Sequence, residues 1–254
     1  VVITPSDHLI ADEDLFMSTI RDAFGYIDEN DVLMTLGVVP TRPDTNYGYI
    51  QAVGGREAYT RNEPMPIKTF TEKPDAELAK VFVESGEFLW NSGIFVWNVK
   101  TIAQELEKYL PDIANQFKDI VPYYYTAEEE EYIKSIYESC NGISIDYGVM
   151  EKTSCSWVFE TSFGWSDVGT WEALYHLGQK DGNENLLSVG DSMIDKVEGS
   201  IIVSSEEDKL VVVKGLKDYM VINTDDVLLV CPRDSVRFKN VITDLTVNEF
   251  DKYQ

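Results

Sequence analysis

Apolar residues follow two different spacings in turn along residues 1–180. Residues 1–3 and 31–39 are continuous apolar runs, which are typical of strands covered on both faces in a mostly parallel sheet. Residues 14–24 instead place their apolar side chains at helical spacing. The same two spacings predict a strand over residues 93–99 and helices over residues 75–85, 100–118, 127–140 and 170–177. Alternating strands and helices favour an α/β sheet with right-handed crossovers.

The pattern changes after a polar stretch rich in glycine and asparagine at residues 178–185. Only short strands follow, separated by polar turns, and they cover residues 200–204, 210–213, 219–223 and 227–231. We therefore expect two domains, an α/β domain over residues 1–180 and a small all-β module over residues 181–254. The sequence shows no repeat strong enough to define a solenoid.

Composition narrows the possible partners. The chain has 254 residues, of which 44% are hydrophobic, so it can bury the core of a globular protein. Lysine and arginine total 21 against 45 acidic residues, and the net charge of -24 excludes nucleic acid and anionic membrane surfaces as main partners. No apolar run reaches the roughly 20 residues that a membrane span needs. Three cysteines without paired spacing favour a reducing compartment, and we expect the cytoplasm.

Two short segments contain residues that could contact a ligand. Asp7 follows the end of the first predicted strand, where ligands bind in open α/β sheets, although it could instead cap backbone groups of a turn. Gly48 lies between Tyr47 and Tyr49, so a ligand could come close to the backbone there while the rings flank it. An aromatic hairpin turn explains the same residues.

Two pairs of polar residues have side chains suited to a sugar phosphate. Glu72 and Lys73 end an extended run before a proline, and neighbours in a strand point to opposite faces, so we expect them to address different partners rather than each other. A lysine suits a phosphate, and a carboxylate accepts hydrogen bonds from sugar hydroxyls. Solvated surface charges are the alternative. Asn91 and Ser92 both donate and accept, as sugar hydroxyls require, although turns use both residue types as well.

Asp167 lies between two tryptophans, Trp165 and Trp171, just before a predicted helix. It could cap that helix. If Asp7 and Asp167 converge in the fold, the pair could instead hold Mg²⁺, which takes oxygen ligands and bridges carboxylates to substrate phosphates. Sequence separation neither excludes nor establishes this convergence.

Six segments occur in the order PSDH, NYGYI, FTEKP, WNSGIF, IDYGVMEK and FGWSDVGTW. In this order they resemble the mannose-1-phosphate guanylyltransferases of the sugar nucleotidyltransferase family, over nearly the whole chain. The resemblance implies a Rossmann-like nucleotidyltransferase fold with a mixed sheet and flanking helices, followed by a β-helix-like C-terminal module. It also implies transfer of a guanylyl group from GTP to mannose 1-phosphate, giving GDP-mannose and pyrophosphate.

The resemblance also implies a role for individual residues. Asp7 and Asp167 would bind magnesium, and Lys73 would hold the sugar phosphate. The mannose pocket would be formed by five further residues, which are Tyr47, Gly48, Glu72, Asn91 and Ser92. Asp146 and Glu151 match family positions to which the resemblance gives no definite role.

One family feature is absent from the sequence. The family opens with a Gly-rich loop, containing an arginine and followed by a lysine, that cradles the nucleotide triphosphate, and no such loop occurs here. We therefore expect a chain that begins inside the family pattern, lacks the guanine and triphosphate contacts, and is inactive by itself. Two alternatives stay open: a nucleotidyltransferase for another hexose 1-phosphate and nucleotide, or a non-catalytic sugar-phosphate-binding module. A homodimer is an expectation from the resemblance alone.

Overall fold

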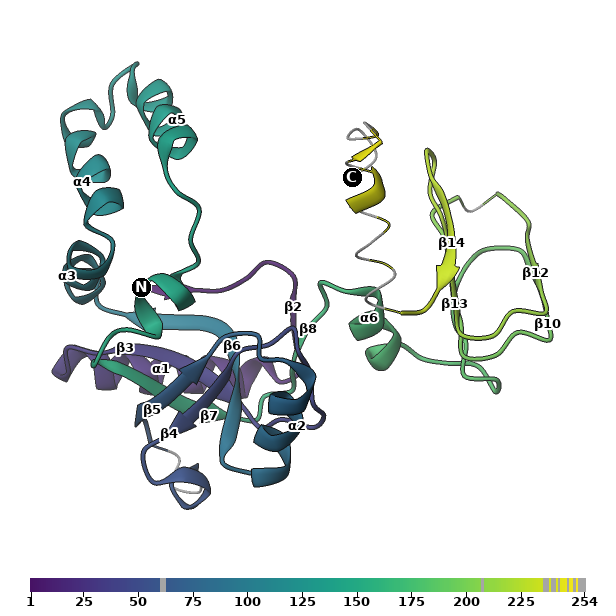
Figure 1. The fold of residues 1–254 in the computed structure, drawn as a ribbon, viewed down its shortest axis with the longest axis horizontal. Helices are drawn as coiled ribbons and strands as arrows, with labels where there is room; N and C mark the ends of the chain where they lie inside the picture. Colours follow the sequence, from purple (N-terminus) through teal and green to yellow (C-terminus); the bar gives the residue numbers. More distant parts are fainter. Residues whose placement is uncertain are drawn as a thin grey trace. The chain divides into compact units, whose positions relative to one another are not determined.

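The computed structural model describes residues 1–59, 63–206 and 208–234, together with residues 238, 241, 243–245, 247, 248 and 250. It divides into two compact units, Val1–Trp165 and Ser166–Gln254, whose arrangement relative to each other is not determined (Figure 1). The division falls before the boundary expected at residue 180, because helix α6 (Trp171–Leu177) packs with the strands that follow it. The expected all-β module runs to residue 254, and most of its residues after 234 lie outside the described residues. No helix within the described ranges is long and apolar enough to cross a membrane.

A mixed sheet forms the centre of the first unit. Its strands, in spatial order, are β1 (Val2–Ile3), β6 (Phe88–Trp97), β3 (Leu33–Val38), β7 (Ser156–Thr161), β5 (Met65–Thr71) and β4 (Tyr49–Ala52). Within this sheet β3 and β7 run parallel, the other described pairs are antiparallel, and β6 also pairs with β4. The expectation of a mostly parallel sheet around residues 31–39 is therefore wrong. The apolar run shows that β3 is buried on both faces, but not the direction of its neighbours.

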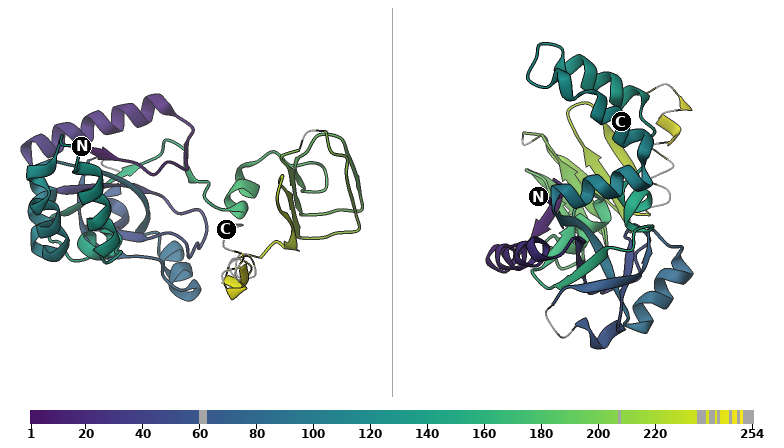
Figure 2. Two further views of the ribbon diagram at one scale, coloured as in Figure 1. Left: turned by 90° about the horizontal axis from the view of Figure 1, so that it is seen from above. Right: turned by 90° about the vertical axis from the view of Figure 1, so that its left-hand side faces the viewer.

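Helix α1 (Glu13–Glu29) covers one face of this sheet (Figure 2). Asp12 caps its first turn by accepting a hydrogen bond from the Leu15 backbone N–H at 2.9 Å. Buried side chains of α1 pack against those of β3, β6 and β7, and this cluster contains Ile20, Ala23, Ile27, Met34, Leu36, Ile94, Val96 and Phe159. Because successive residues of a strand face opposite sides, the cluster takes up one face of each strand and leaves the other for a second layer.

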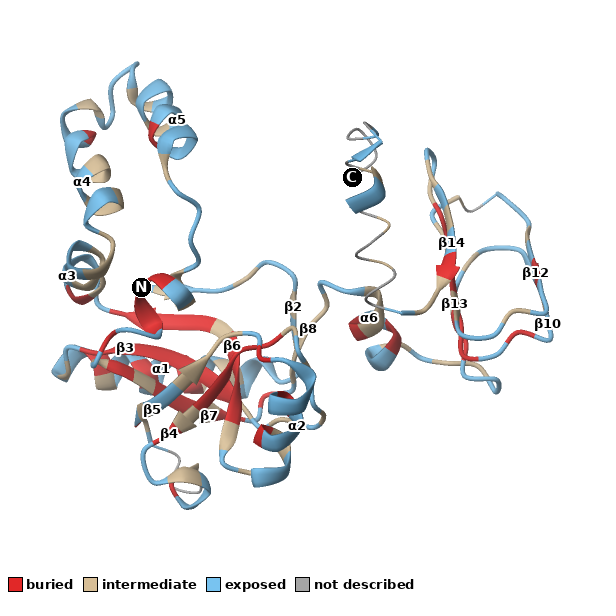
Figure 3. Cartoon of the chain, in the orientation of Figure 1, coloured by how far each residue is buried: buried red, intermediate tan, exposed pale blue. Residues whose placement is uncertain are grey.

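The second layer consists of α3 (Val99–Tyr109) and the π-helical turn Asp146–Met150. Its buried contacts with the sheet are made by Leu33, Phe95, Trp97, Val149 and Met150. Thr35 is two residues from Leu33 along β3, so the alternation of the strand places Thr35 on this same face. The strands are the most deeply buried elements of the unit, as the red segments of Figure 3 show.

The predicted helix over residues 100–118 is two helices, α3 and α4 (Pro111–Asp119). Pro111 lacks a backbone N–H to donate, so the chain breaks at Leu110 and a new helix starts with the proline in its first turn. After α4 come the 3-10 turn Val121–Tyr123 and α5 (Glu129–Ser139), and α4 and α5 extend away from the sheet (Figure 1). The other elements are β2 (His8–Ile10), the 3-10 turn Gly55–Glu57, α2 (Ala76–Ser85) and β8 (Trp165–Asp167).

The second unit continues from α6 as strands that alternate between two small sheets. One sheet stacks β9 (Leu186–Ser188), β11 (Ile201–Ser204) and β13 (Tyr219–Asn223) in parallel, with β14 (Leu228–Pro232) antiparallel at its edge. The other pairs β10 (Ser192–Asp195) with β12 (Val211–Lys214) in parallel. Parallel strands that alternate between two sheets form successive coils. The expected β-helix-like module is therefore confirmed.

The coils differ in length, which hides their repeat in the sequence. Ile201 pairs with Leu186 of the coil before it and with Met220 of the coil after it, at unequal sequence separations. Asn185 occupies the corner of the first coil, where its side chain is fully buried and accepts a hydrogen bond from the Ser200 N–H at 3.0 Å. A buried amide is stable at such a corner only when its polar atoms have partners.

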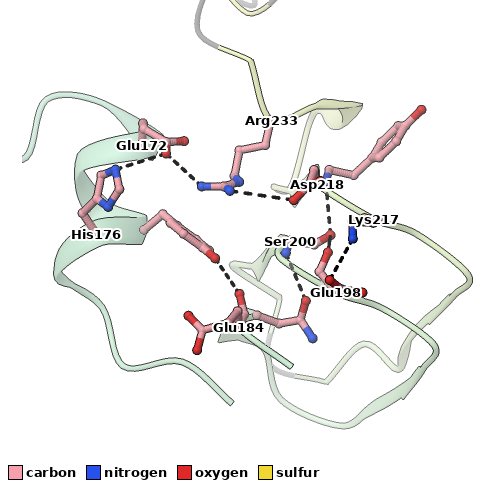
Figure 4. Close-up of polar contacts among 11 residues, drawn as sticks. Glu172, His176, Glu184, Glu198, Ser200, Lys217, Asp218 and Arg233 are labelled. Carbon is pink, nitrogen blue, oxygen red and sulfur yellow. Dashed lines mark hydrogen bonds and ion pairs between the residues drawn. The ribbon is translucent and has the colours of Figure 1, made fainter. Parts of the chain in front are cut away.

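Arg233 joins α6 to the strands of the second unit (Figure 4). Its guanidinium lies 3.8 Å from the centre of the Tyr175 ring, and its Nη1 atom donates to Glu172 of α6 at 2.8 Å. Its Nη2 atom lies 3.9 Å from a carboxylate oxygen of Asp218. Only 17% of the Arg233 side chain is exposed, but Glu172 and Asp218 are 43% and 56% exposed, so water screens the ion pairs more than the contact with the Tyr175 ring.

We expect Arg233→Met to lower the free energy of unfolding by about 1–2 kcal/mol, because it removes the cation–π contact with Tyr175 and the ion pair with Glu172 but keeps an apolar stem. Lys217→Met is the matched control, since the pair between Lys217 and Glu198 at 2.8 Å is exposed. That control should change the free energy of unfolding by at most about 0.5 kcal/mol. Urea unfolding followed by far-UV circular dichroism measures both variants, and equal losses would contradict the role given to Arg233.

Candidate functional site

Strand β6 contains a bulge in the segment WNSGIF, which includes the predicted sugar-binding residues Asn91 and Ser92. Thr35 of β3 is paired with Phe95, yet Gly37 is paired with Asn91, so three residues of β6 stand opposite Leu36 alone. Ser92 stabilises the bulge: its Oγ atom donates to the Leu36 carbonyl at 2.7 Å, and only 1% of the residue is exposed. Bulges of this kind re-aim side chains next to functional sites. The Ser92 hydroxyl thus bonds within the sheet, whereas the Asn91 side chain also reaches Asp146.

Asn91 connects the sheet to the π-helical turn. Its Oδ1 atom accepts from Thr35 Oγ1 at 2.8 Å and from the Gly93 N–H at 3.3 Å. Its Nδ2 atom donates to Asp146 Oδ1 at 2.9 Å, and its backbone N–H donates to the Gly48 carbonyl at 2.8 Å. With 8% of its surface exposed, Asn91 is a buried side chain held by four contacts.

Glu72 and Lys73 contact each other, contrary to the expectation from strand alternation. Strand β5 ends at Thr71, and Lys73 has a φ of 47°, in the left-handed region, so the pair lies in a turn where alternation does not apply. Lys73 Nζ lies 3.2 Å from Glu72 Oε1. The turn is held from the other side by Glu151, whose Oε1 atom accepts from the Glu72 backbone N–H at 3.1 Å.

The second carboxylate oxygen of Glu72 is buried without a hydrogen-bond partner among the described residues. It lies against Gly48, where a Cβ atom would come within 2.3 Å of Glu72 Oε2 and 3.3 Å of the Asn91 Cβ atom. Only glycine therefore allows the carboxylate to reach this place beside Asn91. An acceptor that is buried and unpaired is costly, and in a native structure it indicates a missing partner such as a ligand.

The charges in this cluster shift the pKa values of Glu72, Asp146 and Lys73. Burial and the charge of Asp146 raise the pKa of Glu72, although Lys73 opposes this. Burial also raises the pKa of Asp146, against the hydrogen bond from Asn91. Burial lowers the pKa of Lys73, but the hydrogen bond and the charge of Glu72 outweigh it and leave that pKa raised. The ammonium group therefore stays charged at neutral pH and is suited to an anionic group next to acceptors for hydroxyls.

The turn that carries Asp7 lies against the same bulge. A Cβ atom at Gly93 would lie 3.4 Å from Pro5 Cγ and 3.9 Å from His8 Cε1, and Asp7 is an exposed carboxylate between these two residues. His8 has a structural contact, since its Nδ1 atom accepts from the Trp165 indole N–H at 3.0 Å. The segment PSDH therefore reaches the strand that carries Asn91.

Asp167 belongs to the second unit, and its position relative to Asp7 is not determined. Its Oδ1 atom accepts from the Gly169 N–H at 2.7 Å. Among the described residues no group of three or more histidine, cysteine or acidic side chains could hold a metal ion. A magnesium site built from the two aspartates alone stays a prediction.

Tyr47 lies within an aromatic cluster and is buried, with 7% of its surface exposed. Its ring contacts those of Trp90 and Trp165 at centroid distances of 5.0 and 5.3 Å. The Arg42 guanidinium lies 5.2 Å from the Trp90 ring centre and pairs with Asp44 at 2.9 Å. Tyr47 thus supports the strand next to Gly48 from within the core.

Three residues that sequence reasoning left without a role belong to this cluster of contacts. Thr35 is a lone hydroxyl inside the apolar run at residues 31–39, and a polar residue in such a run was the signal that could have found it. Asp146 and Glu151 stood out only as matches to the segment IDYGVMEK. Their contacts with Asn91 and with the Glu72 backbone join residues from distant parts of the chain.

Known proteins resemble this chain over its whole length. A mannose-1-phosphate guanylyltransferase from Escherichia coli is 36% identical over 253 residues, covering 98% of this chain and 53% of the relative. One from Klebsiella pneumoniae is 36% identical over 256 residues, covering 100% of this chain and 53% of the relative. The chain thus spans about half the length of these curated relatives.

A solved structure from Thermus thermophilus, named mannose-1-phosphate geranyltransferase, superposes with a TM-score of 0.79 at 29% identity, covering 96% of this chain and 69% of that one. A second, named mannose-6-phosphate isomerase from Helicobacter pylori, gives a TM-score of 0.54 at 28% identity, covering 65% of this chain and 63% of that one. The family model described as nucleotidyl transferase matches residues 1–184. The chain accordingly belongs to the nucleotidyl transferase family.

Proposed function

We propose that this chain forms the sugar-phosphate side of a mannose-1-phosphate guanylyltransferase, which transfers a guanylyl group from GTP to mannose 1-phosphate and releases pyrophosphate. The observation that carries the proposal is the buried, unpaired Glu72 Oε2 atom next to Asn91 and to a charged lysine. Membership of the nucleotidyl transferase family and the names of the relatives support the reaction and the sugar.

The contacts of the site suit a sugar phosphate in particular. A hydroxyl group donates one hydrogen bond and accepts others, and the site offers a carboxylate acceptor in Glu72 and an amide donor in Asn91. Lys73 supplies a single positive charge on a flexible stem, of which 58% is exposed, and can reach a phosphate at the edge of the site. The absent side chain at Gly48 lets the Glu72 carboxylate lie next to Asn91.

The proposed reaction requires charge neutralisation and alignment rather than proton transfer. The attacking oxygen of mannose 1-phosphate is already anionic at neutral pH, so no general base is needed. Lys73 would offset part of the negative charge of the sugar phosphate and fix its position relative to the α-phosphate of GTP. We assign no residue of this chain to guanine or to the triphosphate.

Magnesium is the metal that we propose for this reaction. Asp7 offers exposed carboxylate oxygens, which are the hard ligands that Mg²⁺ takes, and Asp167 is the predicted second ligand with one oxygen not engaged by Gly169. When bound, the ion would neutralise phosphate charge. Product formation by the intact protein from mannose 1-phosphate with GTP, compared with UTP and ATP, tests the proposed reaction, and a preference for another nucleotide would contradict it.

We expect Lys73→Met to raise the KM for mannose 1-phosphate about 10–100-fold, the range for loss of a charge-assisted contact with a phosphate. The KM for GTP should change little, because Lys73 is assigned to the sugar phosphate alone. Lys68→Met is the matched control, since Lys68 is an exposed lysine of the neighbouring strand β5. Steady-state kinetics of the intact protein, with each substrate varied in turn, measure the effect. An unchanged KM for mannose 1-phosphate would refute the assignment.

We expect Glu72→Gln to weaken mannose 1-phosphate binding about tenfold or more, because an amide replaces the acceptor proposed to bind a sugar hydroxyl. The same change should stabilise the fold at pH 7. Burial raises the folded-state pKa of Glu72 above its usual value, so the folded state binds the proton more tightly and stability falls as pH rises between the usual and the raised pKa. Glutamine avoids that loss.

Calorimetric titration with mannose 1-phosphate and thermal unfolding at pH 7 and pH 4 measure the two effects of Glu72→Gln. The control is Glu84→Gln, at a glutamate whose side chain is 65% exposed. A variant that binds the sugar phosphate normally, or one whose thermal midpoint at pH 7 falls below that of the parent, would show that the Glu72 carboxylate is a structural group.

A further inference from the structure

We propose that Asp146 and Thr35 are positioning residues that fix the side-chain amide of Asn91, so that Asn91 presents an N–H donor, and never its carbonyl, to the sugar. The inference rests on the proposed function for the identity of the sugar, but the geometry that carries it is independent of any substrate. It assigns a role to two residues that contact no substrate themselves.

The orientation of the Asn91 amide follows from two of its partners, Gly93 and Asp146. The Thr35 hydroxyl can donate or accept, and its hydrogen also faces the Ile94 carbonyl at 3.2 Å, so Thr35 holds the amide in place without selecting its orientation. The Gly93 backbone N–H, 3.3 Å from Oδ1, can only donate. An ionised Asp146 can only accept, and its Oδ1 atom lies 2.9 Å from Nδ2. Rotation of the amide by half a turn would set the NH2 group against the Gly93 N–H and the carbonyl against the Asp146 carboxylate. Both contacts would then be repulsive, so the network admits a single orientation.

The fixed orientation decides what Asn91 has left to offer. Its Oδ1 atom faces two donors, the Gly93 N–H and the Thr35 hydroxyl at 2.8 Å, whose hydrogen is shared with the Ile94 carbonyl at 3.2 Å. Its Nδ2 atom carries two hydrogens, of which Asp146 takes one. We assign the second hydrogen to a ligand, because the unpaired Glu72 Oε2 atom and the Asn91 Cβ atom both lie on the side of Gly48 where a Cβ would be.

A donor and an acceptor at one place match a single hydroxyl group or two adjacent ones. Such a hydroxyl accepts from Asn91 and donates to Glu72, which pairs the Glu72 oxygen that is otherwise buried alone. Were the Asn91 carbonyl exposed instead, it would present a second acceptor next to a carboxylate, and a hydroxyl has only one hydrogen to give. The polarity of the Asn91 amide is therefore a condition for hydroxyl binding.

The surroundings of Asp146 suit a positioning role. It begins the π-helical turn, whose residues Val149 and Met150 are 0% and 1% exposed and anchor it to the sheet. Such turns inside helical segments are frequent at functional sites. The charge of Lys73 lowers the pKa of Asp146 and the charge of Glu151 raises it, while Asn91 donates a side-chain hydrogen bond to its carboxylate. A rigid anchor with one directed acceptor holds a neighbouring amide in a defined orientation.

The orientation of the amide can be tested without substrate by nuclear magnetic resonance of protein labelled with ¹⁵N at asparagine. Loss of a signal pair in Asn91→Asp identifies the Asn91 side-chain NH2 group. We expect Asp146→Ala to shift this pair and to speed its hydrogen exchange, and we expect Asp146→Asn, which keeps an acceptor of the same size, to shift it less. Asp119→Asn, at an exposed site on α4, is the control. Unchanged Asn91 signals in Asp146→Ala would overturn the proposal.

Kinetics test whether the orientation matters for the sugar. In the intact protein, Asp146→Ala and Thr35→Val should each raise the KM for mannose 1-phosphate about tenfold, the effect of one misdirected hydrogen bond, and leave the KM for GTP within about twofold. Asp146→Asn and Thr35→Ser, which restore the acceptor and the hydroxyl, should recover most of the loss. A tenfold rise that the restoring variants fail to reverse would mark both residues as merely structural and overturn the inference.

The two tests separate failure of this inference from failure of the proposed function. If the intact protein, with its nucleotide-binding portion, forms no GDP-mannose but the Asn91 signals respond to Asp146→Ala as expected, the proposed function fails and the positioning of the amide stands. If GDP-mannose forms and the signals do not respond, the positioning fails alone. Far-UV circular dichroism of each variant confirms its fold, and the ¹⁵N spectrum of the two restoring variants serves where an alanine or valine variant does not fold.

Discussion

The hydrogen bond from Thr35 to Asn91 joins the two central strands where their ladder is interrupted. The bulge in β6 removes regular pairing at this point, and the side chains of Ser92 and Asn91 replace it with contacts to β3. The Asn91 backbone meanwhile bonds to Gly48, and its amide bonds to Asp146. One residue thereby ties together β3, the segment before β4 and the π-helical turn. The relative positions of the polar groups in the site depend on this junction.

The site concentrates polar groups that a core selected for stability alone would exclude. Two carboxylates are mostly buried, and burial raises the pKa of both. One oxygen of Glu72 has no partner among the described residues. Such groups destabilise a fold unless a ligand completes their contacts, and proteins keep them mainly where function requires them. The surrounding apolar layers, with strand side chains such as Leu33 fully buried, supply the stability that compensates.

Much of the fold could be predicted from the sequence, because apolar spacing reports burial directly. The runs at residues 1–3 and 31–39, the main helices and the β-helix-like module all have their counterparts in the structure. Strand direction could not be predicted, since burial on both faces leaves it open, and neither could the break at Pro111 within one continuous apolar pattern. The repeat of the second unit could not be recognised either, because its coils differ in length.

The site was predictable in part for a similar reason. Glu72, Lys73, Gly48 and Asn91 were identified from residue chemistry and resemblance, and the structure brings them together. Their mutual contacts were not predictable, because they depend on a bulge and on a left-handed turn that override strand alternation. Thr35 could not be assigned a role from the sequence, because its hydroxyl lies in an apolar run and its partner, Asn91, is on the neighbouring strand.

The coiled architecture of the second unit has a consequence for how its length can change. Each coil pairs with the coils before and after it, and the corner residue Asn185 bonds to Ser200 at the start of the next coil. Whole coils can be gained or lost at the open edge of the stack while the buried side chains of the others keep their registration. A single inserted residue within a strand, by contrast, would exchange its inward and outward faces. Divergence of this unit should proceed in whole-coil steps, with the first unit unaffected.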